Sequence, residues 1–196
     1  MLFRPYLEVL LGSRVKINVL RALWKHGGKE FTIRELANFL GLSHAGVRKA
    51  LADLEKVNVI AMRTVGKSYT VRFNAASYAA RIIEEIFKLE GGTLEELKRA
   101  LKKGLDIPEV VSAALFGSVA RGEETPLSDV DLLVVTNYRE KLEEVISHLQ
   151  RGVALRFGNT LTPYYLSEEE FEEKKDTPLV KQILKNHILV CGKGFV

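Results

Sequence analysis

Hydrophobic residues recur three or four positions apart through the first sixty residues of the chain, and this spacing predicts three helices. The helices are expected to begin at Ser13, Thr32 and Ser43. Thr32 and Glu35 have the spacing of a capping box, in which each side chain bonds the backbone of the other residue. Gly41-Leu42 separates the second helix from the third and predicts a tight turn between them.

Two apolar segments, residues 60–65 and 69–73, follow the helices and predict a β-hairpin around Gly66-Lys67. Three helices and a hairpin in this order resemble the winged helix-turn-helix fold of many small transcription regulators. In that fold the third helix enters the DNA major groove, and the hairpin meets phosphates beside the groove. The resemblance therefore implies a surface that binds duplex DNA. Its expected residues are Ser43, His44, Arg48 and Lys49 on the third helix and Arg63, Lys67 and Arg72 on the hairpin.

Basic residues are concentrated in the same part of the chain. Residues 1–75 hold 13 Lys and Arg against 5 Asp and Glu, whereas residues 76–196 hold 16 against 20. A basic module of this size favours a polyanionic partner, which agrees with DNA binding. A solvated basic face, or a winged helix that serves in dimerisation or protein docking, would account for the same residues.

Residues 76–106 are expected to connect the two halves of the chain through two helices and a hinge at Gly91-Gly92. Tyr78, Ile82 and Ile86 form one stripe of the first of these helices, which is amphipathic. The helix either pairs two chains or covers the core of its own domain. Pairing into a homodimer is preferred, because a dimeric regulator matches the two-fold symmetry of its operator.

The second half of the chain contains two apolar runs separated by polar residues. Residues 110–116 predict a buried strand that ends at Gly117-Ser118, and residues 132–135 predict another that follows Asp129 and Asp131. Alternate side chains of a strand share a face, so these two carboxylates point the same way and repel unless a cation lies between them. A Gly-Ser turn lets backbone and hydroxyl approach a phosphate. The pattern therefore predicts a site for a nucleoside triphosphate and magnesium.

A resemblance to a known family rests on two segments of this region. They are Gly117-Ser118-Val119-Ala120-Arg121-Gly122 and Ser128-Asp129-Val130-Asp131-Leu132-Leu133-Val134. Both are similar to the signature of the DNA polymerase beta-like nucleotidyltransferase superfamily, above all to its minimal nucleotidyltransferase branch. The resemblance implies that Gly117 and Ser118 hold the triphosphate, ATP being expected, and that Arg121 neutralises phosphate charge. It implies further that the catalytic residues Asp129 and Asp131 coordinate Mg²⁺ or Mn²⁺.

Active members of this family carry a third carboxylate on the next strand. The strand expected at residues 160–166 has Thr162 at about that position, and a threonine hydroxyl supplies no negative charge. No Asp or Glu farther along the sequence lies within an apolar strand segment. Nucleotide binding is therefore expected, while turnover is left open.

Two functions of different class follow from these observations. In the first, the chain is an enzyme that transfers a nucleotide, AMP being expected, to a hydroxyl of a protein or small molecule, and DNA binding regulates its own synthesis. In the second, it is a transcription regulator whose nucleotidyltransferase-like domain senses a nucleotide or docks a partner. Antitoxins of the minimal nucleotidyltransferase group fit either function, so a toxin-like protein is a further expected partner.

Composition and length agree with a chain of two domains. A hydrophobic content of 46% and a charged content of 28% are those of a soluble globular protein, and no apolar run approaches the about 18 residues of a membrane helix. A cytoplasmic protein without a membrane partner is expected, with Cys191 as a buried structural thiol. The expected class is α+β, with a winged helix-turn-helix domain at residues 1–75, connecting helices at 76–106, and a small mixed-sheet nucleotidyltransferase-like α/β domain at 107–196.

Overall fold

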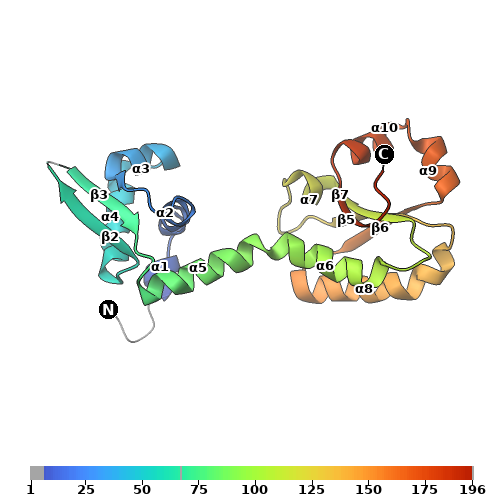
Figure 1. Ribbon diagram of the computed structural model, residues 1–196, viewed down its shortest axis with the longest axis horizontal. Helices are drawn as coiled ribbons and strands as arrows, with labels where there is room; N and C mark the ends of the chain where they lie inside the picture. The colour runs from blue at the N-terminus through green and yellow to red at the C-terminus, as the bar shows by residue number, and fades with distance from the viewer. Residues whose placement is uncertain (1–6, 67, 196) are drawn as a thin grey trace. The chain divides into compact units, whose positions relative to one another are not determined.

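A computed structural model describes residues 7–66 and 68–195, and the chain divides after Gly92 into two units with separate hydrophobic cores (Figure 1). The elements of the first unit are α1 (Leu7–Leu11), α2 (Arg14–Lys25), β1 (Phe31–Thr32), α3 (Ile33–Leu40), α4 (His44–Lys56), β2 (Ile60–Val65), β3 (Ser68–Phe73) and α5 (Tyr78–Gly91). The elements of the second unit are α6 (Thr93–Leu105), β4 (Ser112–Phe116), α7 (Gly117–Arg121), β5 (Val130–Val135), the 3₁₀ turn Arg139–Leu142, α8 (Glu143–Phe157), β6 (Leu161–Leu166), α9 (Glu168–Lys174), α10 (Pro178–Lys185) and β7 (Ile188–Gly192).

The first unit is a winged helix, as its sequence predicts. Helices α2, α3 and α4 pack around one core, and β2 and β3 form the expected antiparallel hairpin. A third strand, β1, pairs with β3 and gives the sheet the order β1-β3-β2. The sequence did not reveal β1, because a strand of two residues is too short to show an alternating pattern.

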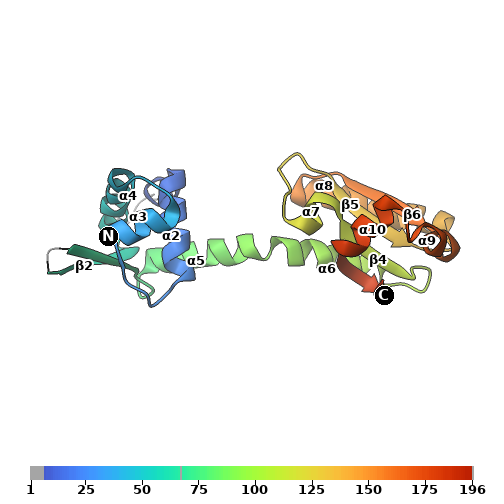
Figure 2. The same cartoon turned by 90° about the horizontal axis from the view of Figure 1, so that it is seen from above.

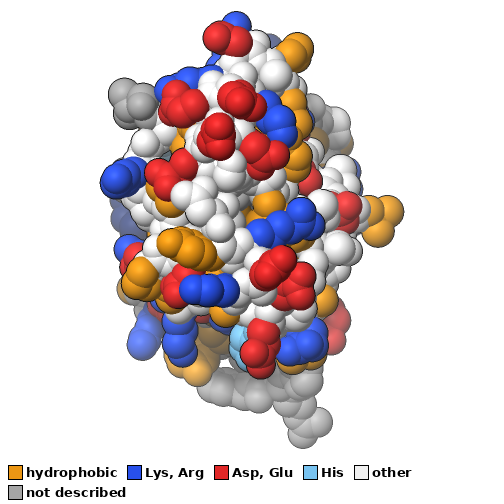
Figure 3. All heavy atoms as spheres, turned by 90° about the vertical axis from the view of Figure 1, so that its right-hand side faces the viewer, with side chains coloured by type: hydrophobic (Ala, Val, Ile, Leu, Met, Phe, Trp, Pro, Cys, Tyr) orange, Lys and Arg blue, Asp and Glu red, His pale blue; other side chains and the backbone are white. Residues whose placement is uncertain are grey.

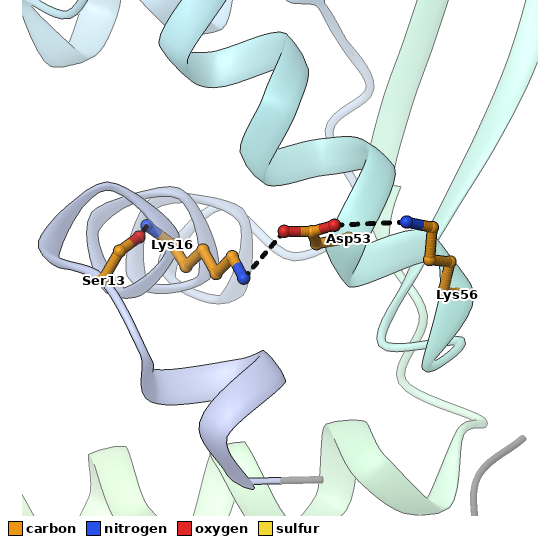
Figure 4. A network of polar contacts seen from close by, with 4 residues as sticks. All are labelled: Ser13, Lys16, Asp53 and Lys56. Carbon is orange, nitrogen blue, oxygen red and sulfur yellow. Dashed lines mark hydrogen bonds and ion pairs between the residues drawn. The ribbon is translucent and has the colours of Figure 1, made fainter.

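Local bonds at the helix ends fix the position of α4. The capping box of Thr32 and Glu35 is present, and Gly41 ends α3 in the left-handed conformation that a glycine adopts without strain. An ion pair of 2.9 Å joins Lys16 of α2 to Asp53 of α4, and Asp53 also accepts from Lys56 at 3.3 Å (Figure 4). Hydrogen bonds from these two lysines hold the pKa of Asp53 below its ordinary value.

Helix α5 covers the core of its own unit. Ala79, Ala80, Ile83 and Phe87 are buried in that core, whereas Tyr78 is exposed. The structure thus has the packing named as the alternative to pairing, and Ile86 of the stripe expected to pair also packs against this core.

The second unit is a four-stranded mixed sheet with the order β6-β5-β4-β7. Strand β5 runs parallel to β6, and β4 runs antiparallel to both β5 and β7. Helices α6 and α8 cover one face of the sheet, and α9 and α10 cover the other (Figures 1 and 2). This is the small mixed sheet with helices that the sequence predicts.

Two polar or reactive features of the second unit are structural, and one of them, the buried Cys191 thiol, is expected from the sequence. Acidic side chains gather on the face drawn in Figure 3. At the start of α9, Glu170 completes a capping box with Ser167. Cys191 is buried, donates to the Leu105 carbonyl at 3.3 Å, and has a pKa that burial raises to about 11. Among the described residues, no helix is both long enough and apolar enough to span a membrane.

Candidate functional site

The chain makes a sharp turn at Gly117, where β4 ends and α7 begins. Gly117 has a φ of 69°, which places it in the left-handed region. A Cβ atom on this residue would overlap Oδ2 of Asp131 on the neighbouring strand. The Gly117 backbone therefore lies directly against the Asp131 carboxylate, and only glycine allows this approach.

Strand register places Asp131 and Thr162, two positions singled out in the sequence, in one row with Phe116. Phe116 of β4 pairs with Asp131 of β5, which in turn pairs with Thr162 of β6. Paired residues of adjacent strands project from the same face. Leu133, two residues beyond Asp131, packs against the helical layer of α9 and α10, so the row lies on that face of the sheet.

Asp129 lies just before β5, close enough for its charge to act on Asp131. Burial raises the pKa of Asp131 above its ordinary value, the negative charge of Asp129 raises it further, and the positive charge of Arg121 lowers it. Neither carboxylate has a hydrogen bond or ion pair with another residue that the structure describes. The pair is thus a local excess of negative charge that a cation would relieve.

The donor set fits one divalent cation bound together with phosphate oxygens. Magnesium in proteins is commonly held by one or two carboxylates, with substrate phosphates and waters as its other ligands. Within residues 7–66 and 68–195, no cluster contains three or more His, Cys, Asp or Glu side chains suited to a metal. Thr162, exposed beside Asp131, stands where a third carboxylate would lie on β6.

Arg121 lies one helical turn beyond Gly117. Its Nε atom donates to Glu123 at 2.7 Å, so part of its charge is offset locally. The positive charge of Arg121 still acts on the Asp131 carboxylate, whose pKa it lowers. The Ser118 side chain adjoins the turn and is half-buried.

A cavity of about 150 Å³ adjoins this turn. It is lined by Phe116, Gly117 and Arg121 from the turn and by Leu179, Gln182, Ile183 and Asn186 from α10 and its end. The sequence did not point to the α10 residues, since they lie more than sixty positions from Gly117 and only the fold brings them together. Gln182 lies within α10, whereas Asn186 ends the helix with a non-helical backbone.

On the winged helix, the exposed N-terminal part of α4 carries His44, Arg48 and Lys49. Ser43 caps α4 by accepting from the Gly46 N–H at 3.1 Å, and its O–H remains a donor. A groove of about 440 Å³ runs from α4 to the hairpin, lined by Thr32, Ile33, Arg34, His44, Arg48, Ser68 and Tyr69. Sequence reasoning did not single out Arg34 or Tyr69.

The hairpin arginines are less free than expected. Arg63 and Arg72 each lie 3.9 Å from the Glu30 carboxylate, which offsets part of their charge. Lys67, expected at the tip of the hairpin, lies outside the described residues.

Comparison with known proteins gives matches to both halves of the chain. The family model described as nucleotidyltransferase domain matches residues 94–191. Two candidate protein adenylyltransferases of Methanocaldococcus jannaschii are similar to this chain. MJ1305 is 28% identical over 110 residues, or 54% of this chain and 74% of that protein. MJ1379 is 41% identical over 73 residues, or 33% of this chain and 73% of that protein.

Two solved structures are similar over about half of the chain. NolR from Sinorhizobium fredii has a TM-score of 0.35 at 21% identity, covering 46% of this chain and 78% of its own. A toxin–antitoxin structure with AMP-PNP has a TM-score of 0.34 at 19% identity, covering 49% of this chain and 73% of its own.

Proposed function

Because the chain belongs to the nucleotidyltransferase domain family, we propose that its second unit binds a nucleoside triphosphate together with a divalent cation. The observation that carries this proposal is the contact between the Gly117 backbone and the Asp131 carboxylate, with Asp129 beside it. Such a turn lets phosphates approach the backbone next to two carboxylates that form no ion pair with any described residue.

Each residue of the turn has a distinct task in the proposed complex. Asp129 and Asp131 hold the cation, and Gly117 lets the phosphates approach the backbone without a side chain in the way. Ser118 supplies a hydroxyl donor, and Arg121 offsets phosphate charge. When bound, the cation would supply the positive charge that stabilises the phosphates during an in-line displacement.

ATP is the proposed nucleotide, and a protein hydroxyl is the proposed acceptor of AMP. The similarity to two candidate protein adenylyltransferases supports both assignments. Thr162 argues for slow transfer, since it brings no charge to the position beside Asp131. If transfer is negligible, the same nucleotide site serves a transcription regulator as a sensor.

We also propose that the winged helix binds duplex DNA, while the second unit of the same chain binds magnesium·ATP. The exposed cations at the start of α4 and the groove beside them support it. A homodimer that pairs through the Tyr78 side of α5 would present two such helices to a two-fold symmetric site.

Replacement of both carboxylates tests the nucleotide site. Asp129→Asn with Asp131→Asn preserves side-chain size but removes the charge that holds the cation, so calorimetry with ATP and excess magnesium should show at least a tenfold loss of affinity. Asp106→Asn, an exposed aspartate elsewhere in the second unit, is the control and should bind as the parent does. Parent-like affinity in the double variant would refute the assignment.

A further inference from the structure

Helices α6 and α8 pack against each other on one face of the sheet and leave a groove between them (Figure 1). The groove has a volume of about 360 Å³. Leu149 and Val153 of α8 form its apolar floor, and both are buried. Lys103, His148 and Arg156 stand at its exposed rim. The second unit therefore has an apolar hollow on its surface, on the side of the sheet opposite α9 and α10.

Small residues open this hollow where side chains would otherwise fill the space between two helices. Ala100 and Gly104 line it from α6, and Gly152 lines it from α8. A Cβ on Gly104 would lie 3.1 Å from the Leu149 side chain, so packing within the chain accounts for that glycine. A Cβ on Gly152 would meet no atom within 4 Å. Glycine destabilises a helix interior relative to alanine, and close approach of a further helix would account for Gly152.

An exposed leucine lies beside the hollow on the same helix. Leu155 is 88% exposed. His148, Gly152 and Leu155 are separated by four and three positions, so they follow one face of α8. A lone exposed leucine is common on protein surfaces, but this one adjoins a hollow of matching apolar character. A projection and a hollow on one surface are self-complementary, because two copies related by a two-fold axis can each fill the hollow of the other.

The charges along α8 indicate the direction in which two such helices would pair. Glu143 and Glu144 lie in its first turn, and Arg151 and Arg156 lie toward its end. Glu96 offsets part of the Arg156 charge, whereas Arg151 forms no ion pair with any residue in the described part of the chain. Antiparallel pairing brings the acidic start of one helix toward the basic end of the other. Parallel pairing would bring like charges together, so the antiparallel arrangement is favoured.

We propose that the groove between α6 and α8 is an interface between two copies of this chain, in which Leu155 of each copy fills the groove of the other between His148 and Gly152. The interface lies wholly within the second unit and is therefore separate from the Tyr78 side of α5. It also lies across the sheet from the Asp131 carboxylate, which projects from the face covered by α9 and α10. Pairing thus leaves the proposed nucleotide site open and does not depend on nucleotide.

Sedimentation velocity of the full chain over a range of concentrations tests this interface. The parent should form a dimer whose fraction grows with concentration. Leu155→Glu puts a charge against the apolar floor of the partner's groove, so the dissociation constant of the dimer should rise at least tenfold. Leu127→Glu, at a leucine that is 94% exposed in the loop before β5, is the matched control and should pair as the parent does.

A second variant tests the groove without adding charge. The space beside Gly152 is open, and leucine favours a helix more than glycine does, so Gly152→Leu should melt at the parental temperature or above it. Its new side chain occupies the place proposed for Leu155 of the other copy. The dissociation constant of the dimer should therefore rise at least tenfold in a chain that keeps its fold.

Three results would overturn the inference. The parent could sediment as a monomer at every concentration that its solubility allows. Leu155→Glu and Gly152→Leu could both pair as the parent does, and dissociation by Tyr78→Glu would then assign pairing to α5. Leu127→Glu could weaken the dimer as much as Leu155→Glu, which would show a general effect of added charge and no specific role for the groove.

Discussion

Gly117 holds its backbone in the left-handed region, with φ at 69°, directly against the Asp131 carboxylate. Gly122, at the other end of α7, has nearly the same φ of 68° but no atom within 4 Å of where a Cβ would stand. The two glycines thus have similar conformational demands and different surroundings. They form a matched pair for measuring what the contact at Gly117 contributes.

Gly117→Ala should abolish nucleotide binding by displacing the Asp131 side chain, whereas Gly122→Ala should leave binding intact. Both variants should lose stability, by more than the about 0.4–1 kcal/mol at stake in a compatible glycine-to-alanine change, because both force alanine to a positive φ. Unfolding in urea and calorimetry with magnesium·ATP separate the two effects. Equal loss of binding in both variants would contradict the role given to this contact.

Under the proposed function, Thr162 distinguishes a fast enzyme from a nucleotide-binding regulator. Its neighbour Asp131 belongs to a two-carboxylate site, and loss of one transition-state group commonly costs on the order of 10²–10³ in rate. We expect slow transfer of label from α-labelled ATP, and a faster rate after Thr162→Asp supplies the charge. Thr162→Asn, similar in size to that variant but neutral, should stay slow.

Two outcomes would contradict this role of Thr162. The parent could turn over at an ordinary enzyme rate of about 1 s⁻¹ or faster. Alternatively, Thr162→Asp could leave an inactive parent inactive, in which case the missing charge is not what limits transfer.

At the scale of elements, the capping box of α3 links stability of the winged helix to pH. Thr32 donates its backbone N–H at 2.7 Å and its hydroxyl at 2.9 Å to Glu35, and these bonds lower the pKa of Glu35 below its ordinary value near 4.5. The stabilisation is therefore present above the ordinary pKa and is lost as pH falls through the lowered one.

Glu35→Gln should lower the melting temperature at pH 7, and the difference from the parent should shrink as the pH falls through the lowered pKa of Glu35 and the carboxylate takes up a proton. Fluorescence of Trp24, the single tryptophan, follows the first unit within the full chain. Glu55→Gln, an exposed glutamate on α4, is the control. A difference that stays constant with pH would show that the carboxylate charge is not involved.

Helix α4 and the hairpin are expected to contribute differently to DNA binding. Arg48→Ala should cost roughly 1–3 kcal/mol and blur sequence preference, because Arg48 lines the groove beside the start of α4. Arg63→Ala should weaken binding to all sequences and reduce the slope of log K against log salt by about 0.9. Lys56→Ala, at the far end of α4, controls for loss of charge. Affinity that does not depend on salt would refute DNA binding by this surface.

The sequence predicted the longer elements because their patterns are local. Caps at Thr32 and Ser43, the hairpin, and the strands around Gly117 each depend on residues within a few positions of one another. It did not predict strand β1 or the cavity wall formed by α10. Both depend on pairing between distant segments, which a local pattern does not encode.

For the candidate site, the sequence placed Asp129 and Asp131 on one face but could not show the contact of Asp131 with Gly117. That contact arises from the register between β4 and β5. Glu30 was also missed as a partner of the hairpin arginines, because it precedes β1 and meets them only through the three-stranded sheet.

At the scale of the whole molecule, the two units keep separate cores and separate candidate sites. The first core includes α5, and the second includes α6, so each helix next to Gly92 belongs to the unit on its own side. The excess of Lys and Arg over Asp and Glu lies in residues 1–75, within the first unit. The proposed DNA-binding surface therefore lies in the first unit, and the proposed nucleotide site lies in the second.

Titration of the unmodified chain with ATP, once in excess magnesium and once in EDTA, decides whether the carboxylate pair forms a metal-dependent nucleotide site. Asp129 and Asp131 repel the triphosphate unless a cation lies between them and the phosphates. We predict saturable binding with magnesium and at least a tenfold weaker affinity in EDTA. Equal affinity in both conditions, or no binding in either, would contradict the proposed site.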